Sequence, residues 1–271
     1  MTENKIAVVI AGCGGRMGRT ILKLIKESSG FELSGALESP GSSLIGHPVS
    51  ELSGEQSDSM LIRADIAEVL SGGEVVIDFT RPEGTRKIAK AVRDGSAALV
   101  TGTTGLSADD EALLKEVAAR TTVVYSANMS AGINLLAGLV EQTAKCLGDD
   151  FDVEIVEMHH RFKEDAPSGT ARLLADRVAA VKDRALDEIK KTGRDGFVGE
   201  RDSDEIGMFA LRGGDVVGDH TVIFAGIGER IELTHRASSR ETFAHGALRA
   251  AHFASESEPG FYTMTDVLGL Q

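Results

Sequence analysis

The chain has 271 residues, of which 42% are hydrophobic, so it is long enough to bury a substantial core in two domains or in one large one. Its formal net charge of -13 argues against a general nucleic-acid binder, because neutralising phosphates requires an excess of clustered Lys and Arg. Its two cysteines, Cys13 and Cys146, lack metal-like spacing and predict a reducing, cytoplasmic location.

The N-terminal segment predicts a soluble chain without a membrane partner. Only six apolar residues, Ile6–Ala11, precede the first glycine, too few for a signal peptide or a membrane span. Their β-branched side chains predict a strand buried on both faces of a parallel sheet. Gly12, Gly15 and Gly18 follow, ahead of a helical pattern. A strand, a glycine turn and a helix form the context in which such glycines bind a dinucleotide.

Glu38 strengthens this interpretation. A second predicted strand, Phe31–Leu37, ends at Glu38, which lies twenty residues after Gly18. A carboxylate at this place accepts hydrogen bonds from the hydroxyls of the adenosine ribose. The glycines alone are equally typical of a plain tight turn, but the strand, the helix and Glu38 together favour a bound cofactor.

Short apolar strands alternate with helices as far as residue 130. After a polar loop with one short turn at 39–58, Pro82 fits the first turn of one helix and Ser107 caps another. This alternation predicts a doubly wound, Rossmann-type parallel α/β sheet. Ligands bind such sheets beyond the carboxyl ends of the strands. Four loops qualify there, at 12–18, 79–82, 101–105 and 126–130.

The pattern changes after residue 130. A helix at 132–146 and a strand at 152–158 precede a long amphipathic helix, predicted from about Ser168 to Lys191. Strand candidates at 207–211, 221–225 and 231–234 and a closing helix at 242–254 follow. Helices followed by a run of strands predict a second, α+β domain with a mixed or antiparallel sheet.

The segment 157–171 combines proton donors with a helix start. His159 and His160 are adjacent, so a continuing strand would point them to opposite faces, and Lys163 lies four positions after His159. Ser168 predicts a helix N-cap, which places the N–H groups of Gly169 and Thr170 in the first turn. These groups suit a substrate carboxylate.

Two other interpretations of this segment stay open. One is a capped helix with two surface histidines. The other is a metal site formed by Glu157, His159, His160 and Asp165, but adjacent histidines are poor ligands for one metal and no H-E-x-x-H spacing occurs. We therefore predict no metal.

Five motifs together resemble one known family. They are Gly12–Gly18 with Arg16-Met17, Phe79–Gly84, Gly102–Gly105, Asn128–Ser130 and His159–Ala171. From near residue 5 to near residue 269 the chain resembles the bacterial dihydrodipicolinate reductases, now called 4-hydroxy-tetrahydrodipicolinate reductases. The resemblance implies reduction of 4-hydroxy-tetrahydrodipicolinate by NADH or NADPH to tetrahydrodipicolinate, with release of water, in the diaminopimelate route to lysine.

The resemblance also implies an organisation and residue roles. It implies a dinucleotide-binding domain at 1–130 and 240–271, a substrate-binding and oligomerisation domain at 131–239, and a homotetramer. His159 and Lys163 would be the catalytic pair, with Lys163 favoured as proton donor, while His160, Gly169 and Thr170 would bind a substrate carboxylate. The residues implied to contact the cofactor are Gly12, Arg16, Met17, Glu38, Arg81, Gly102, Thr104, Ala127 and Met129.

One position departs from the family pattern. Members often carry Arg directly after the acidic residue that ends the second strand, whereas this chain has Ser39 and Pro40 after Glu38. We therefore predict that NADH works at least as well as NADPH, unless a cation such as Arg16 compensates. Two alternatives stay open. Another nicotinamide oxidoreductase explains residues 1–130 equally well but gives no reason for the 159–170 motif, whereas a nucleotide sensor or scaffold that kept the fold would bind cofactor without turnover.

Overall fold

The computed structural model describes residues 5–53, 60–95 and 97–270. The chain divides into two compact units, one formed by Met1–Ala131 with Glu241–Gln271 and the other by Gly132–Arg240. In the described residues no helix is both long and apolar enough to cross a membrane.

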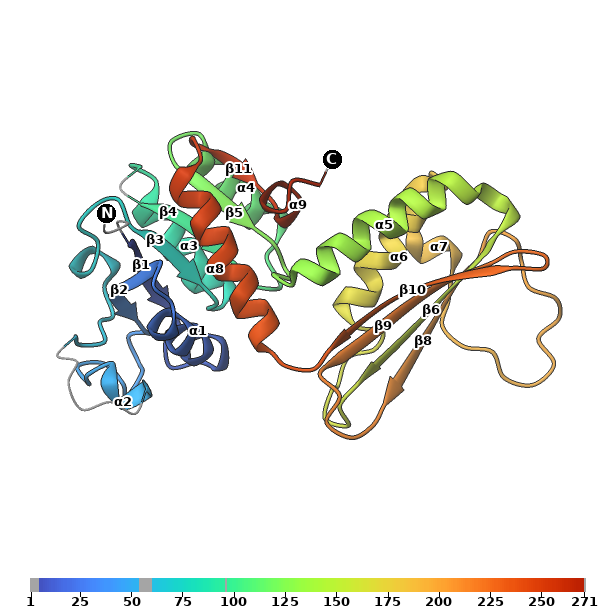
Figure 1. Ribbon diagram of the computed structural model, residues 1–271, viewed down its shortest axis with the longest axis horizontal. Helices are drawn as coiled ribbons and strands as arrows, with labels where there is room; N and C mark the ends of the chain where they lie inside the picture. The colour runs from blue at the N-terminus through green and yellow to red at the C-terminus, as the bar shows by residue number, and fades with distance from the viewer. Residues whose placement is uncertain (1–4, 54–59, 96, 271) are drawn as a thin grey trace. The chain divides into compact units, whose positions relative to one another are not determined.

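The first unit contains a six-stranded parallel sheet (Figure 1). Its spatial order is β11-β5-β4-β3-β1-β2, with β1 at Ile6–Ala11, β2 at Phe31–Leu37, β3 at Val75–Asp78, β4 at Ala98–Thr101, β5 at Thr122–Tyr125 and β11 at Gly260–Tyr262. The predicted doubly wound sheet is confirmed. The strand β11 and the short helix α9 (Met264–Val267) were not predicted.

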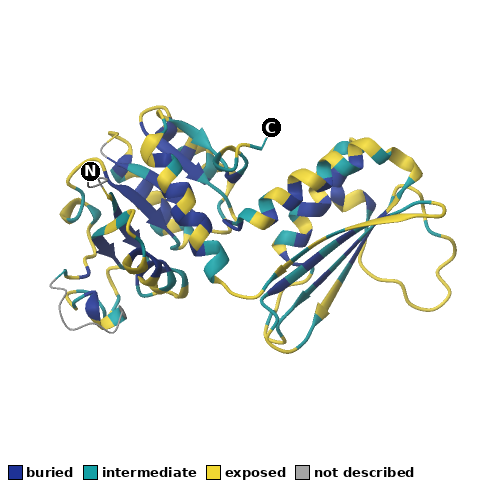
Figure 2. Cartoon of the chain, viewed as in Figure 1, coloured by how far each residue is buried: buried dark blue, intermediate teal, exposed yellow. Residues whose placement is uncertain are grey.

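Helices cover both faces of this sheet because its strands alternate their side chains. Val8 and Ile10 of β1 pack in one core with α1 (Arg16–Glu27) and α8 (Glu241–Glu256). Val9 and Ala11 pack in a separate core with α3 (Pro82–Val92) and α4 (Ala108–Ala118). The strands of this sheet are mostly dark blue, the colour of buried residues, in Figure 2. Because the strands are parallel, their carboxyl ends lie at one edge of the sheet. Each of the four predicted ligand loops begins at this edge, where a strand ends.

The second unit holds a mixed sheet, as predicted. Its order is β10-β9-β6-β8-β7, in which β6 runs parallel to β8 and antiparallel to β9. The helices α5 and α6 pack in one core with the sheet. The bounds are α5 Ala131–Leu147, η2 Gly148–Asp150, β6 Asp152–His159, α6 Gly169–Val181, α7 Leu186–Ile189, β7 Lys190–Lys191, β8 Ile206–Arg212, β9 Gly218–Ala225 and β10 Arg230–Ala237.

The long helix predicted at 168–191 is wrong in its second half. The helix α6 ends at Val181, and Asp183 adopts a left-handed backbone with φ of 52°. This conformation cannot continue a right-handed helix. The chain then forms the single turn α7, and Lys190 and Lys191 join the sheet beside Ile206 and Gly207. Helical periodicity could not predict this pairing, because it depends on residues 206 and 207, far along the chain.

The helix starts predicted from Pro82, Ser107 and Ser168 are confirmed. Pro82 occupies the first turn of α3, Ser107 forms a capping box with Asp110, and Ser168 Oγ accepts the N–H of Ala171 at 3.1 Å. The predicted loop at 39–58 contains the short helix α2 (Ser50–Ser53), and its residues 54–58 lie outside the described residues. A 3-10 turn, η1, spans Ile66–Glu68.

Candidate active site

The glycine turn after β1 is tightly built. Gly12 has a φ of 78°, a left-handed conformation that favours glycine, and its N–H donates to Leu37 O at 2.9 Å. A Cβ atom added at Gly18 would overlap the carbonyl oxygen of Gly12 and the backbone of Cys13. The absence of side chains thus lets the start of α1 pack directly on the turn, as a dinucleotide pyrophosphate requires.

Glu38 lies beside this turn at the end of β2. Its Oε1 accepts the N–H of Gly14 at 2.8 Å, and its Oε2 accepts the N–H of Ser39 at 3.1 Å. These two bonds orient the carboxylate, and each oxygen keeps a lone pair for a further donor. Glu38 can therefore accept hydrogen bonds from ribose hydroxyls without a change of conformation.

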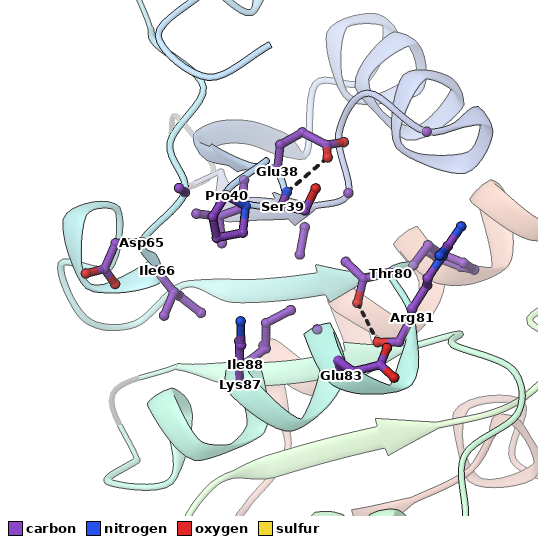
Figure 3. Close-up of a pocket in the computed structure, with 17 residues that line it drawn as sticks. Glu38, Ser39, Pro40, Asp65, Ile66, Thr80, Arg81, Glu83, Lys87 and Ile88 are labelled. Atoms are coloured by element: carbon purple, nitrogen blue, oxygen red, sulfur yellow. Dashed lines mark hydrogen bonds between the residues drawn. The ribbon is translucent and has the colours of Figure 1, made fainter. Parts of the chain in front are cut away.

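Two cavities lie along the edge formed by the carboxyl ends of the strands. The first has a volume of about 750 Å³ and includes Glu38, Ser39, Arg81 and Lys87 in its lining (Figure 3). The second has a volume of about 450 Å³, and Gly15, Phe79 and Thr80 line both. The nine predicted cofactor residues divide between them: Gly12, Glu38 and Arg81 line the first, and Arg16, Met17, Gly102, Thr104, Ala127 and Met129 line the second.

Some lining residues were missed by sequence reasoning. Lys87 follows Glu83 by one turn of the predicted α3 helix, so helical periodicity could have placed both on the cavity side. Phe243 lines the second cavity from α8, more than a hundred residues after the loops it faces. No local signal could have indicated that contact.

In the second unit, β6 places Glu157 and His159 on one face of the sheet. Glu157 is 1% exposed, and its Oε2 lies 2.6 Å from Nδ1 of His159. Its Oε1 accepts the N–H of Ser168, the N-cap of α6, at 3.1 Å. One buried carboxylate thus links the end of β6 to the start of α6.

Arg212, at the end of β8, is a residue that sequence reasoning missed. Its guanidinium donates to Glu157 Oε2 at 2.8 Å and to Oε1 at 2.9 Å, and also to the carbonyl oxygen of Asp165 at 2.7 Å. Burial alone would raise the pKa of Glu157, but hydrogen bonds from Arg212, His159 and Ser168 outweigh it and hold that pKa below its usual value. Glu157 is therefore an ionised, fully engaged carboxylate.

His159 packs against a second histidine, the buried His220 of β9. Their rings meet edge to face, with centroids 5.1 Å apart, and His220 Nε2 lies 3.1 Å from Ser168 Oγ. Burial lowers the pKa of His220 to about 4. Burial also lowers the pKa of His159, although Glu157 opposes that shift. Both imidazoles are consequently neutral at neutral pH.

The loop after β6 carries Lys163 and His160. Lys163 Nζ forms a 2.6 Å ion pair with Asp165, in which the lysine side chain is 18% exposed and the aspartate 65%. The ring of His160 lies 6.3 Å from that of Phe162. Its Nδ1 is buried and has no hydrogen-bond partner among the described residues. The two adjacent histidines therefore occupy different environments.

Gly169 and Thr170 open α6. A Cβ atom added at Gly169 would meet nothing within 4 Å, so packing inside this chain does not explain the glycine. Its N–H belongs to the first helical turn, where no intrahelical acceptor exists. Helix N-termini of this kind bind carboxylates. The open space at Gly169 lets such a group approach the backbone.

The metal interpretation requires Glu157, His159, His160 and Asp165 as ligands. The described residues include no group of three or more His, Cys, Asp or Glu side chains arranged to hold a metal ion. Glu157, which the metal interpretation needs, is occupied by Arg212, His159 and Ser168.

Known proteins match the chain along nearly its whole length. The family model "Dihydrodipicolinate reductase, N-terminus" matches residues 6–129, and "Dihydrodipicolinate reductase, C-terminus" matches residues 132–268. A 4-hydroxy-tetrahydrodipicolinate reductase of Rhodopseudomonas palustris (strain TIE-1) is 50% identical over 268 residues, which cover 98% of each chain. One from Nitrosomonas eutropha is 46% identical, covering 97% of this chain and 98% of the relative.

A solved structure shares the fold. It is a dipicolinate-bound dihydrodipicolinate reductase from Paenisporosarcina sp. TG-14, with a TM-score of 0.71 and 22% identity, covering 97% of this chain and 99% of that one.

Proposed function

The chain belongs to the dihydrodipicolinate reductase family, and we propose that His159 and Lys163 are its catalytic pair. The enzyme reduces 4-hydroxy-tetrahydrodipicolinate to tetrahydrodipicolinate with NADH or NADPH, releasing water, in lysine biosynthesis. The observation that carries the proposed roles is the buried contact between His159 and Glu157. It directs Nδ1 of the imidazole away from any ligand and leaves Nε2 as the ring nitrogen that can face substrate.

The charge states favour Lys163 as the proton donor. Hydride transfer to the substrate leaves an electron-rich enamine that needs a proton. His159 has a lowered pKa and directs Nδ1 to Glu157, so at neutral pH its Nε2 is an acceptor rather than a donor. Lys163 carries protons and is held by one exposed partner, Asp165, which a substrate carboxylate can replace. In this scheme His159 orients Lys163 and substrate by accepting a hydrogen bond.

We assign carboxylate binding to His160, Gly169 and Thr170. The dipicolinate bound to the solved relative is a planar dicarboxylate that resembles the substrate. The N-terminus of α6 offers backbone N–H groups in open space at Gly169, and Thr170 adds a hydroxyl. The buried Nδ1 of His160 without a described partner is a further group that a ligand would satisfy.

The first unit fits a nicotinamide dinucleotide, which supplies the hydride when bound. The tight glycine turn suits the pyrophosphate, and Glu38 suits the adenosine ribose. Phe79 and Thr80 line both cavities, so a dinucleotide that occupied both would pass these two residues. We accordingly assign the dinucleotide-binding role to the first unit and the substrate-binding role to the second.

We also propose a cytoplasmic homotetramer assembled through the second unit. Residues that alternate with the core positions of its sheet face away from α5 and α6, and they include apolar side chains that are half-buried or exposed: Val156, Met158, Phe209, Leu211 and Ile223. The free thiols Cys13 and Cys146 suit a reducing compartment. Light scattering at several concentrations tests the assembly, and a monomer throughout would contradict it.

One assay tests the catalytic pair. Substrate is generated in situ by the preceding synthase, and loss of NADH absorbance is followed for the wild type, His159→Ala and Lys163→Ala. We expect kcat to fall by about a hundredfold or more in both variants. Lys182→Ala is the matched control, because Lys182 is also a half-buried lysine paired with an exposed aspartate, Asp149, in the same unit. Unchanged kcat in both site variants would refute the assigned roles.

A further inference from the structure

Asp78 is a buried carboxylate that the cofactor interpretation leaves unexplained. It is the last residue of β3 and is 0% exposed. Its Oδ1 accepts the N–H of Thr80 at 3.0 Å and the Thr80 hydroxyl at 2.6 Å. Its Oδ2 accepts hydroxyls from three further threonines: Thr85 at 2.6 Å, Thr101 at 2.9 Å and Thr103 at 3.3 Å. All these partners are neutral donors.

Two of the four threonines lie in the loops that line the cavities, and the other two lie directly beside those loops. Thr80 lines both cavities, and Thr103 lines the second. Thr85 lies in α3, behind the Thr80-Arg81 turn, and Thr101 ends β4, ahead of the loop that carries Gly102 and Thr104. Asp78 therefore joins the segment after β3 to the segment after β4.

Neighbouring glycines show how closely these segments pack. A Cβ atom added at Gly102 would overlap the ring of Phe79, and one added at Gly84 would overlap Oγ1 of Thr80. The Thr80 hydroxyl is thus confined between Gly84 and Asp78. Burial of a carboxylate without a cation destabilises a fold unless its oxygens accept hydrogen bonds. We therefore expect the loops to shift when one of the donors is removed, because the shift lets the Asp78 oxygen find another donor.

We propose that Asp78 is a positioning residue for the cofactor: its carboxylate fixes the 79–81 loop against the 101–104 loop before NADH or NADPH binds. The inference rests on the proposed cofactor site in these two cavities. It predicts that substitutions at Asp78, Thr85 and Thr101 weaken cofactor binding although none of these residues lines either cavity.

The test measures the dissociation constants of NADH and of dipicolinate by titration calorimetry on the full-length enzyme. We expect Thr85→Val and Thr101→Val to weaken NADH binding several-fold each, and Asp78→Asn by about tenfold or more, since each disrupts hydrogen bonds at the buried Asp78 side chain. Thr85→Ser keeps the hydroxyl and should restore NADH binding. Dipicolinate affinity should stay within about twofold, because its proposed site lies in the other unit.

Thr121→Val is the matched control. Thr121 is also buried in the same unit, and its hydroxyl donates to Ala97 O at 2.7 Å instead of to Asp78. Thr121→Val should lower the free energy of unfolding about as much as Thr85→Val or Thr101→Val does. It should leave the NADH dissociation constant unchanged. Steady-state kinetics adds a second readout, in which KM for NADH rises while kcat at saturating NADH changes by less than about threefold.

Three outcomes would overturn the inference. They are NADH affinity within about twofold of wild type in the Thr85→Val/Thr101→Val double variant, an equal loss in Thr121→Val, or no rescue by Thr85→Ser. The double variant decides the matter even if Asp78→Asn does not fold. Failure of the wild type itself to bind NADH would instead refute the proposed cofactor site.

Discussion

Arg212 holds Glu157 through two parallel hydrogen bonds of 2.8 and 2.9 Å, although the two residues lie 55 positions apart in the chain. The same guanidinium reaches the carbonyl oxygen of Asp165, the residue that pairs with Lys163. Arg212 thereby connects the orientation of His159 to the loop that carries Lys163. Arg212 therefore holds the partner of each proposed catalytic side chain, Glu157 for His159 and Asp165 for Lys163.

Removal of Arg212 should destabilise the second unit. We predict that Arg212→Ala lowers the free energy of unfolding by about 3 kcal/mol, because it leaves the buried carboxylate of Glu157 without its cation. Urea denaturation measures the loss. Arg230→Ala is the control, since Arg230 pairs with Glu232 on the surface and should cost less than about 1 kcal/mol. If Arg212→Ala and Arg230→Ala lower the free energy of unfolding equally, the buried pair of Arg212 with Glu157 does not stabilise the fold more than a surface pair.

Acid should destabilise the protein through its buried histidines. Burial lowers the folded-state pKa of His220 to about 4 and also lowers that of His159, so below pH 6.5 the unfolded chain binds more protons than the folded chain. Stability is thus fully present above about pH 6.5. It falls as the pH drops toward 4, by about 3 kcal/mol for His220 alone.

Urea titrations across this pH range check the prediction. His220→Asn should flatten the dependence of stability on pH, whereas the exposed His252→Asn should leave it as in the wild type. An unchanged slope in His220→Asn would mean that His220 does not titrate in this range. Depressed carboxylate pKa values, such as that of Glu157, add a further loss only at lower pH.

Cofactor preference should follow Glu38 and its neighbours. We predict that kcat/KM with NADH equals or exceeds that with NADPH, because Glu38 repels a 2′-phosphate and Ser39 supplies no cation. Ser39→Arg should raise kcat/KM for NADPH about tenfold. Ser43→Arg, outside the cavity lining, should not.

A wild-type preference for NADPH of about tenfold would contradict the prediction. Arg81 and Lys87, which line the same cavity, would then be the cations to substitute next.

Substrate binding should require Gly169, whereas folding stability should not. A Cβ atom there meets open space, so Gly169→Ala should fold with unchanged or slightly higher stability while KM for substrate rises about tenfold. Gly138→Ala is the control, because Gly138 is an exposed helical glycine whose Cβ would also meet open space. If KM stays unchanged in Gly169→Ala, the carboxylate does not bind at the α6 N-terminus.

Much of this protein follows from local sequence patterns. The apolar run at 6–11, the glycines after it and the caps at Ser107 and Ser168 each depend on residues within a turn or two, so periodicity and capping rules suffice to predict them. The segment from Glu157 to Thr170 also carries most of its proposed chemistry within fourteen residues. Fold class was accessible for that reason, and the reaction was accessible because this segment and four other motifs carry the family resemblance.

Strand order and register were decided only by the tertiary structure. Arg212 meets Glu157 because β8 pairs with β6 so that His159 lies opposite Arg212, and His220 reaches Ser168 because β9 lies on the other side of β6. Asp78 likewise accepts hydroxyls from Thr85 of α3 and Thr101 of β4, because β3 pairs with β4 and precedes α3. Local patterns report which face of an element is apolar, whereas the neighbour of that face is selected by packing and hydrogen bonding across the whole chain.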